Sequence, residues 1–237
     1  MHGDGTGAGR PARPMVVAAI VGCALFMQML DSTVIATALP VMAKAFHETP
    51  VRLNIAITSY MLSVAIFIPV SGWAADRFGA RGVFRAAIAF FTLSSVLCAL
   101  AQSLPQLVGA RILQGMAGAM MVPVGRIVLL RSAPKDKLVD ALSFLAVPAL
   151  FGPVVGPPLG GFIVTYGAWQ WIFLINVPIG LIGIVLVSLF IDEIHDSEVR
   201  RLDILGFVLT GIGLASLMFG FESMGRGGLR WTATLGV

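Results

Sequence analysis

Charged side chains are scarce in this chain: they make up 12% of its 237 residues, whereas 57% of the residues are hydrophobic. Soluble domains carry roughly 25% charged residues, and the mean hydropathy of +0.93 is equally far from a soluble balance. The scarcity excludes an ordinary soluble domain and predicts a chain that lies in a lipid bilayer.

Cysteine and histidine are also rare, with two and three residues respectively. Cys23 and Cys98 stand alone within apolar runs, and the histidines lie in tails or links at His2, His47 and His195. No zinc, disulfide or catalytic-triad spacing can be assembled from them, so we expect no metal and disfavour a membrane enzyme.

The small charge that remains is basic, with sixteen Lys and Arg residues against twelve Asp and Glu residues. Nucleic-acid binding would require these basic residues on one face, but they are scattered among short links between apolar runs. We therefore predict no nucleic-acid partner. A channel would need a filter loop or a ring of charges, and neither is visible in the sequence.

Seven apolar runs succeed one another, and each is near or above the roughly 20 residues that a membrane-spanning helix needs. They are Met15–Leu39, Leu53–Ala75, Val83–Ala101, Pro105–Leu130, Leu138–Tyr166, Trp171–Ile191 and Leu202–Phe221. The first run is too long for a cleaved signal peptide and carries Asp31 too deep, so it is interpreted as a retained helix. The predicted fold class is an all-α membrane protein.

The runs divide the chain into four parts. We predict a mobile cytoplasmic leader at 1–14, a six-helix bundle at 15–191, a charged cytoplasmic linker at 192–203, and a seventh helix with the start of an eighth at 204–237. The linker separates the bundle from the seventh helix.

Basic residues fall unevenly on the two sides of this arrangement. One side holds Arg10, Arg13, Arg77, Arg81, Arg85, Arg131, Lys135, Lys137, Arg200 and Arg201, and the other holds Lys44, Arg52, Arg226 and Arg230. Because cytoplasmic links carry the excess of Lys and Arg, we expect a cytoplasmic N-terminus. This orientation disfavours a seven-span receptor, whose N-terminus would normally be outside.

Three ionisable side chains fall within predicted spans: Asp31 in the first, and Arg111 and Arg126 in the fourth. Such groups are costly in a membrane and by default suggest function. At 1.5 Å per residue, Asp31 lies about 13 Å and Arg111 about 9 Å from the outer end, so their depths are comparable. Arg126 lies within about one turn of the cytoplasmic end and could extend its charge to the membrane surface.

Asp31 and Arg111 are predicted to couple transport to protons if their helices face a common cavity. Burial would favour a protonated Asp31, whereas Arg111 would favour the anion, so the pair could load and release a proton. Two other interpretations remain open: a fixed buried ion pair, and an Asp31 that only caps locally with Ser32 and Thr33.

A short charged link joins the second and third runs. We assign conformational gating to Gly72, Asp76, Arg77, Gly79 and Arg81. So short a link makes the two helices antiparallel neighbours, with Gly79 and Gly82 permitting the reversal. Asp76, placed among Arg77, Arg81 and Arg85, could hold the helix ends together in one conformation and release them in another.

Small residues and prolines mark two further spans. In the fourth span, Gln114 and Gly115 are assigned to helix packing. In the fifth span, a bent and closely packed helix is predicted at Gly152, Pro153, Gly156, Pro157, Gly160 and Gly161.

Five segments, in order along the chain, resemble motifs of the major facilitator superfamily, in particular its fourteen-span drug:proton antiporter subfamily. They are Leu30–Pro40, Gly72–Phe84, Leu107–Ala119, Gly152–Gly161 and Trp169–Gly180. Ala74 and Ala80 depart from the loop motif, and the second glycine of the fourth-span motif is displaced to Gly118. The resemblance covers about residues 15–221.

The resemblance implies an exporter of drugs or other small hydrophobic, in part cationic, compounds that works by alternating access. It associates Arg111 with proton transfer and the bend at 152–161 with sealing the cavity against leak. The proton gradient would drive transport without a cofactor. The implied partners are a small-molecule substrate, protons and the lipid bilayer, and the implied location is the bacterial inner (plasma) membrane.

Six spans make one half of such a transporter, so we expect a truncated half that needs the missing C-terminal half, or a second copy, to close its cavity. An uncoupled or metabolite-specific carrier of the same superfamily stays open, and more remotely a membrane receptor or enzyme. Candidate pocket residues are Gln28, Asn54, Tyr60, Met61, Met120 and Met121.

Overall fold

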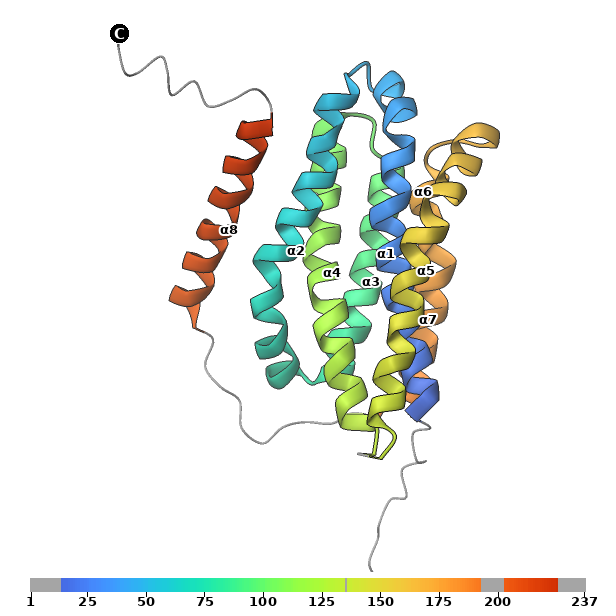
Figure 1. Ribbon diagram of the computed structural model, residues 1–237, viewed down its shortest axis with the longest axis vertical. Coiled ribbons are helices and arrows are strands. Elements are labelled where there is room, and N and C mark those ends of the chain that lie inside the picture. Colours follow the sequence, from blue (N-terminus) through green and yellow to red (C-terminus); the bar gives the residue numbers. More distant parts are fainter. Residues whose placement is uncertain (1–13, 135, 193–202, 226–237) are drawn as a thin grey trace, which may run out of the picture.

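The described part of the chain is built from helices, and the computed structural model describes residues 14–134, 136–192 and 203–225 (Figure 1). The helices are α1 (Pro14–Ala45), α2 (Pro50–Phe78), α3 (Ala80–Ala99), α4 (Leu104–Ser132), α5 (Leu138–Tyr166), α6 (Trp171–Leu174), α7 (Asn176–Phe190) and α8 (Ile204–Gly225). Residues 1–13 of the predicted leader, the linker residues 193–202 and the predicted start of an eighth span lie outside the described residues.

Six stretches within the described residues are long and apolar enough to cross a membrane, which confirms the six spans predicted for the bundle. The seventh predicted run lies in α8, where the apolar stretch among the described residues is shorter, at Leu205–Leu217. The sixth is Trp171–Phe190, formed by α6 and α7 together. These two helices are separated at Ile175, where Pro178 has no N–H to donate back to the carbonyl of Leu174. The break therefore has a local cause in the sequence.

The start and end of α2 show how residue choice sets the helix limits. The side chain of Thr49 accepts a hydrogen bond from the Arg52 N–H at 3.3 Å, and Pro50 occupies the first turn, where no donor is needed. The helix ends at Gly79, whose φ of 84° is readily adopted only without a side chain. Gly79 alone makes the turn into α3, so the link is shorter than predicted and Gly82 lies within α3.

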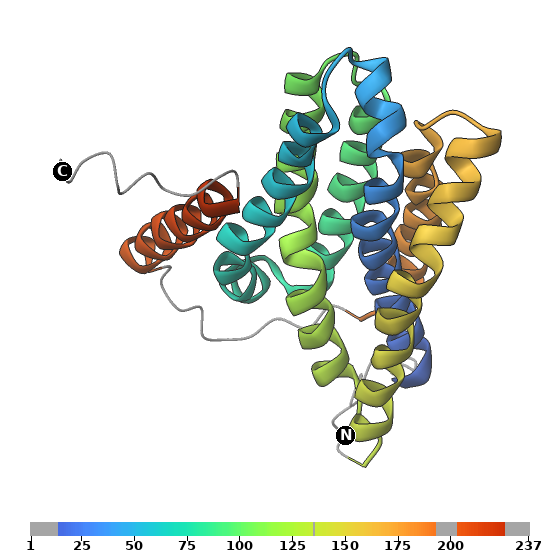
Figure 2. The same ribbon diagram turned by 45° about the horizontal axis from the view of Figure 1, so that its top comes forward.

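Helix α1 occupies the centre of the bundle and packs most extensively against α5, with further contacts to α2, α4, α6 and α7. On the other side, α4 packs between α2 and α3. Figures 1 and 2 show α5 and α7 on one side of α1, and α2 on the other. Helix α8 stands outside the six-span bundle and packs against α2, where the rings of Phe67 and Phe207 lie 5.9 Å apart.

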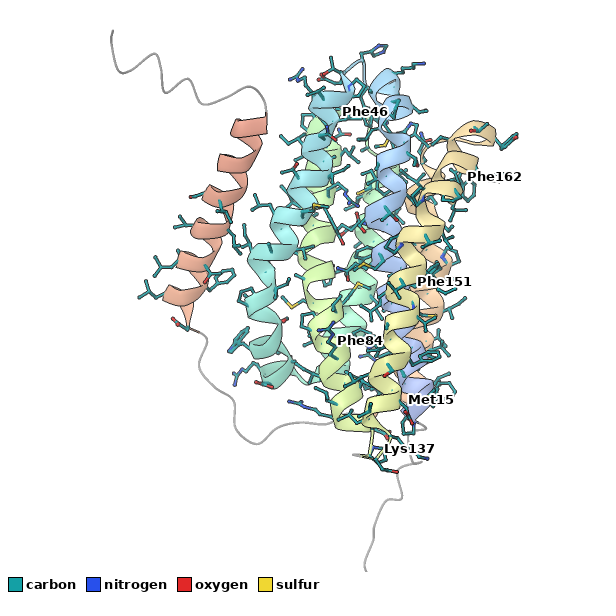
Figure 3. The ribbon with its side chains drawn as sticks, viewed as in Figure 1. Met15, Phe46, Phe84, Lys137, Phe151 and Phe162 are labelled. Atoms are coloured by element: carbon teal, nitrogen blue, oxygen red, sulfur yellow. The ribbon has the colours of Figure 1, made fainter. Side chains whose placement is uncertain are left out.

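The bundle ends alternate as the sequence predicted. Met15 and Lys137 lie at one end of the molecule, and Phe46 lies at the opposite end (Figure 3). The links at Gly79 and between α4 and α5 share the end of Met15, so the basic residues on those links gather there. The opposite end carries Lys44 and Arg52.

Two apolar clusters fill the interior, one on each side of a polar layer. The first joins the beginning of α1, up to Met27, with Phe84 and Phe91 of α3. The second joins the rest of α1, from Leu30, with Phe173 of α6. Between the clusters lie buried polar side chains from α1, α3, α4 and α7: Gln28, Asp31, Ser95, Arg111, Gln114 and Asn176.

Candidate functional site

The polar layer is organised around an ion pair between Asp31 of α1 and Arg111 of α4. Arg111 Nη1 donates to Asp31 Oδ2 at 2.6 Å, and the exposed fractions of the two side chains are 1% for Asp31 and 0% for Arg111. The comparable depths inferred from the sequence therefore do bring the two groups together. Their assignment to proton coupling stays a prediction.

Asp31 does not form the local cap with Ser32 and Thr33 that the sequence left open. The Ser32 hydroxyl donates to the Met29 carbonyl at 2.8 Å, and the Thr33 hydroxyl donates to backbone carbonyls of α1 at 3.0 Å. Both hydroxyls are thus bonded to their own helix. The carboxylate of Asp31 is directed instead at other helices.

Gln114 and Asn176 complete the coordination of the Asp31 carboxylate. Gln114 Nε2 donates to Asp31 Oδ1 at 3.0 Å, and Asn176 Nδ2 donates to the same oxygen at 2.9 Å. Both amides also donate to Ser95 Oγ, at 2.8 Å and 3.2 Å. Helices α1, α3, α4 and α7 therefore meet in one hydrogen-bonded network.

Gln114 has a different role from the helix packing that was assigned to it. Its Oε1 accepts from Arg111 Nη1 at 2.6 Å while its amide nitrogen holds Asp31, so it braces the ion pair. Gly115 does serve packing: a Cβ there would lie 2.6 Å from the carbonyl oxygen of Tyr60 and 2.7 Å from Ser63 Cβ. The closeness of α2 and α4 depends on that missing side chain.

Aromatic rings cover the guanidinium of Arg111. Its central carbon lies 4.1 Å from the centre of the Tyr60 ring and 5.8 Å from that of Phe173. Such contacts stabilise a desolvated cation by about 2 kcal/mol or more. The ion pair is consequently closed off from two sides by rings as well as by helices.

Ser95 and Asn176 are site residues that the sequence analysis missed. Ser95 looks like one of many hydroxyls within an apolar span, and nothing in its spacing distinguishes it from Ser94. Asn176 gave a clearer signal, because an amide is costly inside so apolar a run and needs a partner there. The partner, Asp31, is 145 residues away in the sequence.

A cavity of about 240 Å³ opens next to this network. It is lined by Gln28, Met29, Ser32, Tyr60, Met61, Val64, Ala65 and Ile68. The Gln28 amide and the Tyr60 hydroxyl converge at Gly118, where an added Cβ would lie 3.3 Å and 3.2 Å from them. Of the candidate pocket residues, Gln28, Tyr60 and Met61 thus line one cavity.

The other candidate pocket residues lie elsewhere. Asn54 is exposed on α2 and Met121 is buried in the apolar core. Met120 lines a separate groove of about 570 Å³ formed by α2, α3 and α4.

Among the residues assigned to gating, Asp76 forms an ion pair with a residue outside the link. Asp76 pairs with Arg131 of α4 at 3.1 Å, and not with Arg77, Arg81 or Arg85 as predicted. Local sequence could not show this, because the end of α4 reaches Asp76 only through the packing of α2 on α4. The side chain of Arg81 donates to the Ser188 carbonyl of α7 at 2.6 Å.

The remaining gating residues have fewer constraints. Arg77 is exposed, and a Cβ at Gly72 would meet nothing within 4 Å. Gly79 makes the turn between α2 and α3, as predicted. Arg126, considered for a role within the membrane, is exposed on α4.

The glycines of the fifth span place α5 directly on α1. A Cβ at Gly156 would overlap Thr33 Oγ1, one at Gly160 would overlap Thr37 Oγ1, and one at Gly152 would overlap Met29. The predicted close packing is therefore present at these three positions. It does not extend to Gly161, where a Cβ would meet nothing within 4 Å.

The prolines of the same segment lie away from this contact. Pro153 and Pro157 are exposed, next to the buried glycines in sequence but on another face of α5. The helix runs without interruption from Leu138 to Tyr166. The glycines at 152, 156 and 160 therefore face α1, whereas Pro153 and Pro157 lie on the outer face.

The described residues hold no group of three or more His, Cys, Asp or Glu side chains that could bind a metal ion.

A transmembrane helix bundle whose buried charges are confined to one polar layer is typical of membrane transporters. A model of the Major Facilitator Superfamily matches residues 21–221, and the chain belongs to that family. It is a multi-pass membrane protein and not an enzyme.

Curated relatives are similar over most of the chain. It is 46% identical over 203 residues to MdtD of Yersinia enterocolitica, with 86% of this chain and 43% of the relative covered. It is 44% identical over 218 residues to MdtD of Serratia proteamaculans, with 92% and 46% covered. The names of both relatives give multidrug resistance as a proposed role, and this chain spans less than half of their length.

Solved structures show the same fold at low sequence identity. A D-xylose-proton symporter matches with a TM-score of 0.66 and 18% identity, over 86% of this chain and 54% of its own. The inward-open xylose transporter XylE of E. coli matches with a TM-score of 0.67 and 16% identity, over 93% and 57%. These likenesses concern the fold alone.

Proposed function

We propose that this chain provides the proton-coupling half of an antiporter that exports drugs or other small hydrophobic compounds by alternating access. The observation that carries the proposal is the Asp31–Arg111 pair, which is fully buried within an otherwise apolar bundle. Charges are retained at such a depth only at considerable cost, which points to function. The similarity to proteins named for multidrug resistance supports the direction and the substrate class.

Proton exchange at Asp31 would alter the network that joins the helices. With Asp31 charged, the carboxylate compensates the positive charge of Arg111, and α1 is hydrogen-bonded to α4 and α7. With Asp31 protonated, the attraction to Arg111 weakens, so α1 becomes freer to move against α4. Such a change in helix contacts is what a rocking transporter requires at its coupling site.

The cavity beside the network supports hydrophobic substrates. Its lining combines two thioethers, one aromatic ring and aliphatic side chains with the amide of Gln28. Met side chains adapt to ligands of different shape, which suits a broad substrate range. The lining holds no carboxylate, so the preference for cations rests on the resemblance to the antiporter subfamily.

The proposed partners are protons, a small-molecule substrate, the lipid bilayer and a second six-helix half, supplied by a C-terminal half or by another copy of the chain. The proton gradient drives the cycle without a cofactor. We place the protein in the bacterial inner membrane with its N-terminus in the cytoplasm, because Arg81, Arg131 and Lys137 belong to the end of the bundle where Met15 lies.

The test is export of a fluorescent lipophilic cation and of a neutral hydrophobic dye from cells. The chain is expressed alone and joined to the C-terminal half of the Serratia relative, each with Asp31 or with Asp31→Asn. We expect export by the joined protein that is lost on Asp31→Asn. Export by the short chain alone would indicate that two copies pair.

An uncoupled or metabolite-specific carrier is the second candidate, favoured by the fact that Asp31 already has three donors and could be a fixed structural pair. In that case the Asp31→Asn variant would still carry substrate down its gradient. Flux by the unmodified joined protein that ignores the pH gradient and is unchanged by Asp31→Asn would contradict proton coupling. Flux that loses its pH response only in Asp31→Asn would support it.

A further inference from the structure

The Asp31 carboxylate is surrounded by hydrogen-bond donors, which suit the anion. A protonated Asp31 also needs an acceptor for its proton. Oδ2 accepts from Arg111, and Oδ1 accepts from Gln114 and Asn176. A protonated carboxyl becomes a donor at one oxygen, and its proton needs an acceptor at a site where all three partners now donate. At least one of the three partners must then change from donor to acceptor.

Two of the three partners cannot make that change. Arg111 has only donors. Gln114 has its amide oxygen occupied, because Oε1 accepts from Arg111 Nη1 at 2.6 Å and faces Cys98 Sγ at 3.6 Å. Rotating the Gln114 amide would turn its NH2 group against the guanidinium and lose that strong bond.

Asn176 is the partner that can change. Its exposed fraction is 0%, and its Oδ1 has no hydrogen-bond partner among the described residues. A half-turn of the amide replaces Nδ2 by Oδ1 at almost unchanged shape. The rotation gives up the bonds that Nδ2 donates to Asp31 and Ser95, breaks none at Oδ1, and places an acceptor where Asp31 would present its proton.

Ser95 can adjust to the same rotation. Its hydroxyl now accepts from both amides and donates to the Phe91 carbonyl at 2.9 Å. A hydroxyl both donates and accepts, so it can turn its hydrogen from Phe91 toward the rotated oxygen of Asn176. In the acid state the Asp31 proton and the Ser95 hydroxyl therefore both find an acceptor at the rotated Asn176 Oδ1.

We propose that Asn176 is the positioning residue that recognises both protonation states of Asp31, donating to the carboxylate and, after rotation of its amide, accepting from the acid. The inference rests on the proposed function, in which Asp31 exchanges a proton. Besides Asp31, the buried ionisable side chains among the described residues are Arg111 of α4, Tyr60 of α2 and Cys98 of α3. Helices α5, α6 and α7 contribute none to that set.

The chain offers an unusually clean measurement because it contains two asparagines, Asn54 and Asn176. The protein is labelled with ¹³C and ¹⁵N in asparagine only, placed in lipid nanodiscs, and followed by NMR as the pH is lowered. Asn54 is exposed on α2 and serves as the internal reference. A parallel sample labelled in aspartate, compared with Asp31→Asn, reports when Asp31 becomes protonated.

We expect two opposite changes at Asn176 that accompany the protonation of Asp31. The Cγ signal moves downfield as Oδ1 accepts a hydrogen bond, and the Nδ2 proton signals move upfield as their bond to the carboxylate is lost. Both changes are absent in Asp31→Ala, which adds no third labelled asparagine, and Asn54 shows neither. A Cγ signal that stays constant while Asp31 titrates would show a fixed donor and overturn the inference.

If Asp31 remains charged throughout, the proposed function and the inference both fail. If Asp31 is protonated while the Asn176 signal stays constant, only the inference fails. A second measurement uses Asn176→Leu, with Ser188→Ala as the control on the same helix. The infrared carbonyl band of protonated Asp31 should shift to higher frequency in Asn176→Leu, because its proton loses the acceptor, and stay unchanged in Ser188→Ala. An unshifted band in Asn176→Leu would also overturn the inference.

Discussion

Two carboxylate–arginine pairs join α4 to its neighbours, and they differ in burial. Asp31 and Arg111 lie 2.6 Å apart with exposed fractions of 1% and 0%, whereas Asp76 and Arg131 lie 3.1 Å apart with 32% and 21%. The buried pair needs Gln114, Asn176 and two aromatic rings around it. The pair at the bundle end has water as an alternative partner, so it can open at little cost.

The two ion pairs of α4 should therefore respond to different events. A buried charge must keep every partner, and its state changes only when a proton arrives or leaves. A half-exposed pair can separate whenever the helix ends move apart. Under the proposed function, coupling lies at the middle of α4 and gating at its end.

Arg111→Ala is expected to have the largest effect, because it leaves the Asp31 carboxylate buried without its cation. Breaking one partner of a buried pair costs about 3–5 kcal/mol. Thermal unfolding in detergent micelles measures the loss. The control is Arg52→Ala in the exposed Arg52–Glu48 pair, which should change the unfolding temperature far less.

The double variant Arg111→Ala with Asp31→Asn makes this prediction sharper. Removing both charges leaves no unpaired ion, so much of the lost stability should return. A double variant as unstable as Arg111→Ala alone would show that Arg111 acts through its contacts with Tyr60 and Phe173 instead.

Gly156→Val is expected to have the next largest effect, because it pushes α1 from the side opposite the buried pair. The new side chain would overlap Thr33, and overpacking of this kind costs roughly 1–3 kcal/mol. Unfolding in micelles measures the cost. Gly161→Val is the matched control, since a Cβ at Gly161 meets nothing within 4 Å and the variant should therefore show no overpacking cost.

Sequence patterns predicted the spans, the alternation of their ends and the pairing of Asp31 with Arg111. They succeeded because apolar length, charge bias and intramembrane charges are each visible locally. They failed where a partner comes from a distant helix: Asp76 was expected to pair within its own link, and Asn176 was not assigned at all. The glycines of α5 show the same limit, because Gly156 and Gly161 look alike in sequence and differ only in what faces them.

Ser95→Ala tests whether the buried pair depends on its surroundings. The change removes the acceptor shared by Gln114 and Asn176, although both amides keep their bonds to Asp31. We expect a loss of about 1–3 kcal/mol from the N–H groups left without that acceptor. Ser94→Ala is the control, because the Ser94 hydroxyl donates only to the Phe90 carbonyl of its own helix. Equal losses in the two variants would place Ser95 outside the network.

Asp76→Asn is expected to have the smallest effect on stability, about 0.2–1 kcal/mol, because both partners of its pair already reach water. Added salt should weaken the Asp76–Arg131 pair in the unmodified protein and leave the Asp31–Arg111 pair unaffected. Unfolding measured at low and high salt therefore separates the pairs: the difference between Asp76→Asn and the unmodified chain should shrink, and that of Arg111→Ala should persist. If the small stability effect accompanies a large loss of export in the joined protein, the pair at the bundle end acts in gating, since holding the fold together would require the reverse.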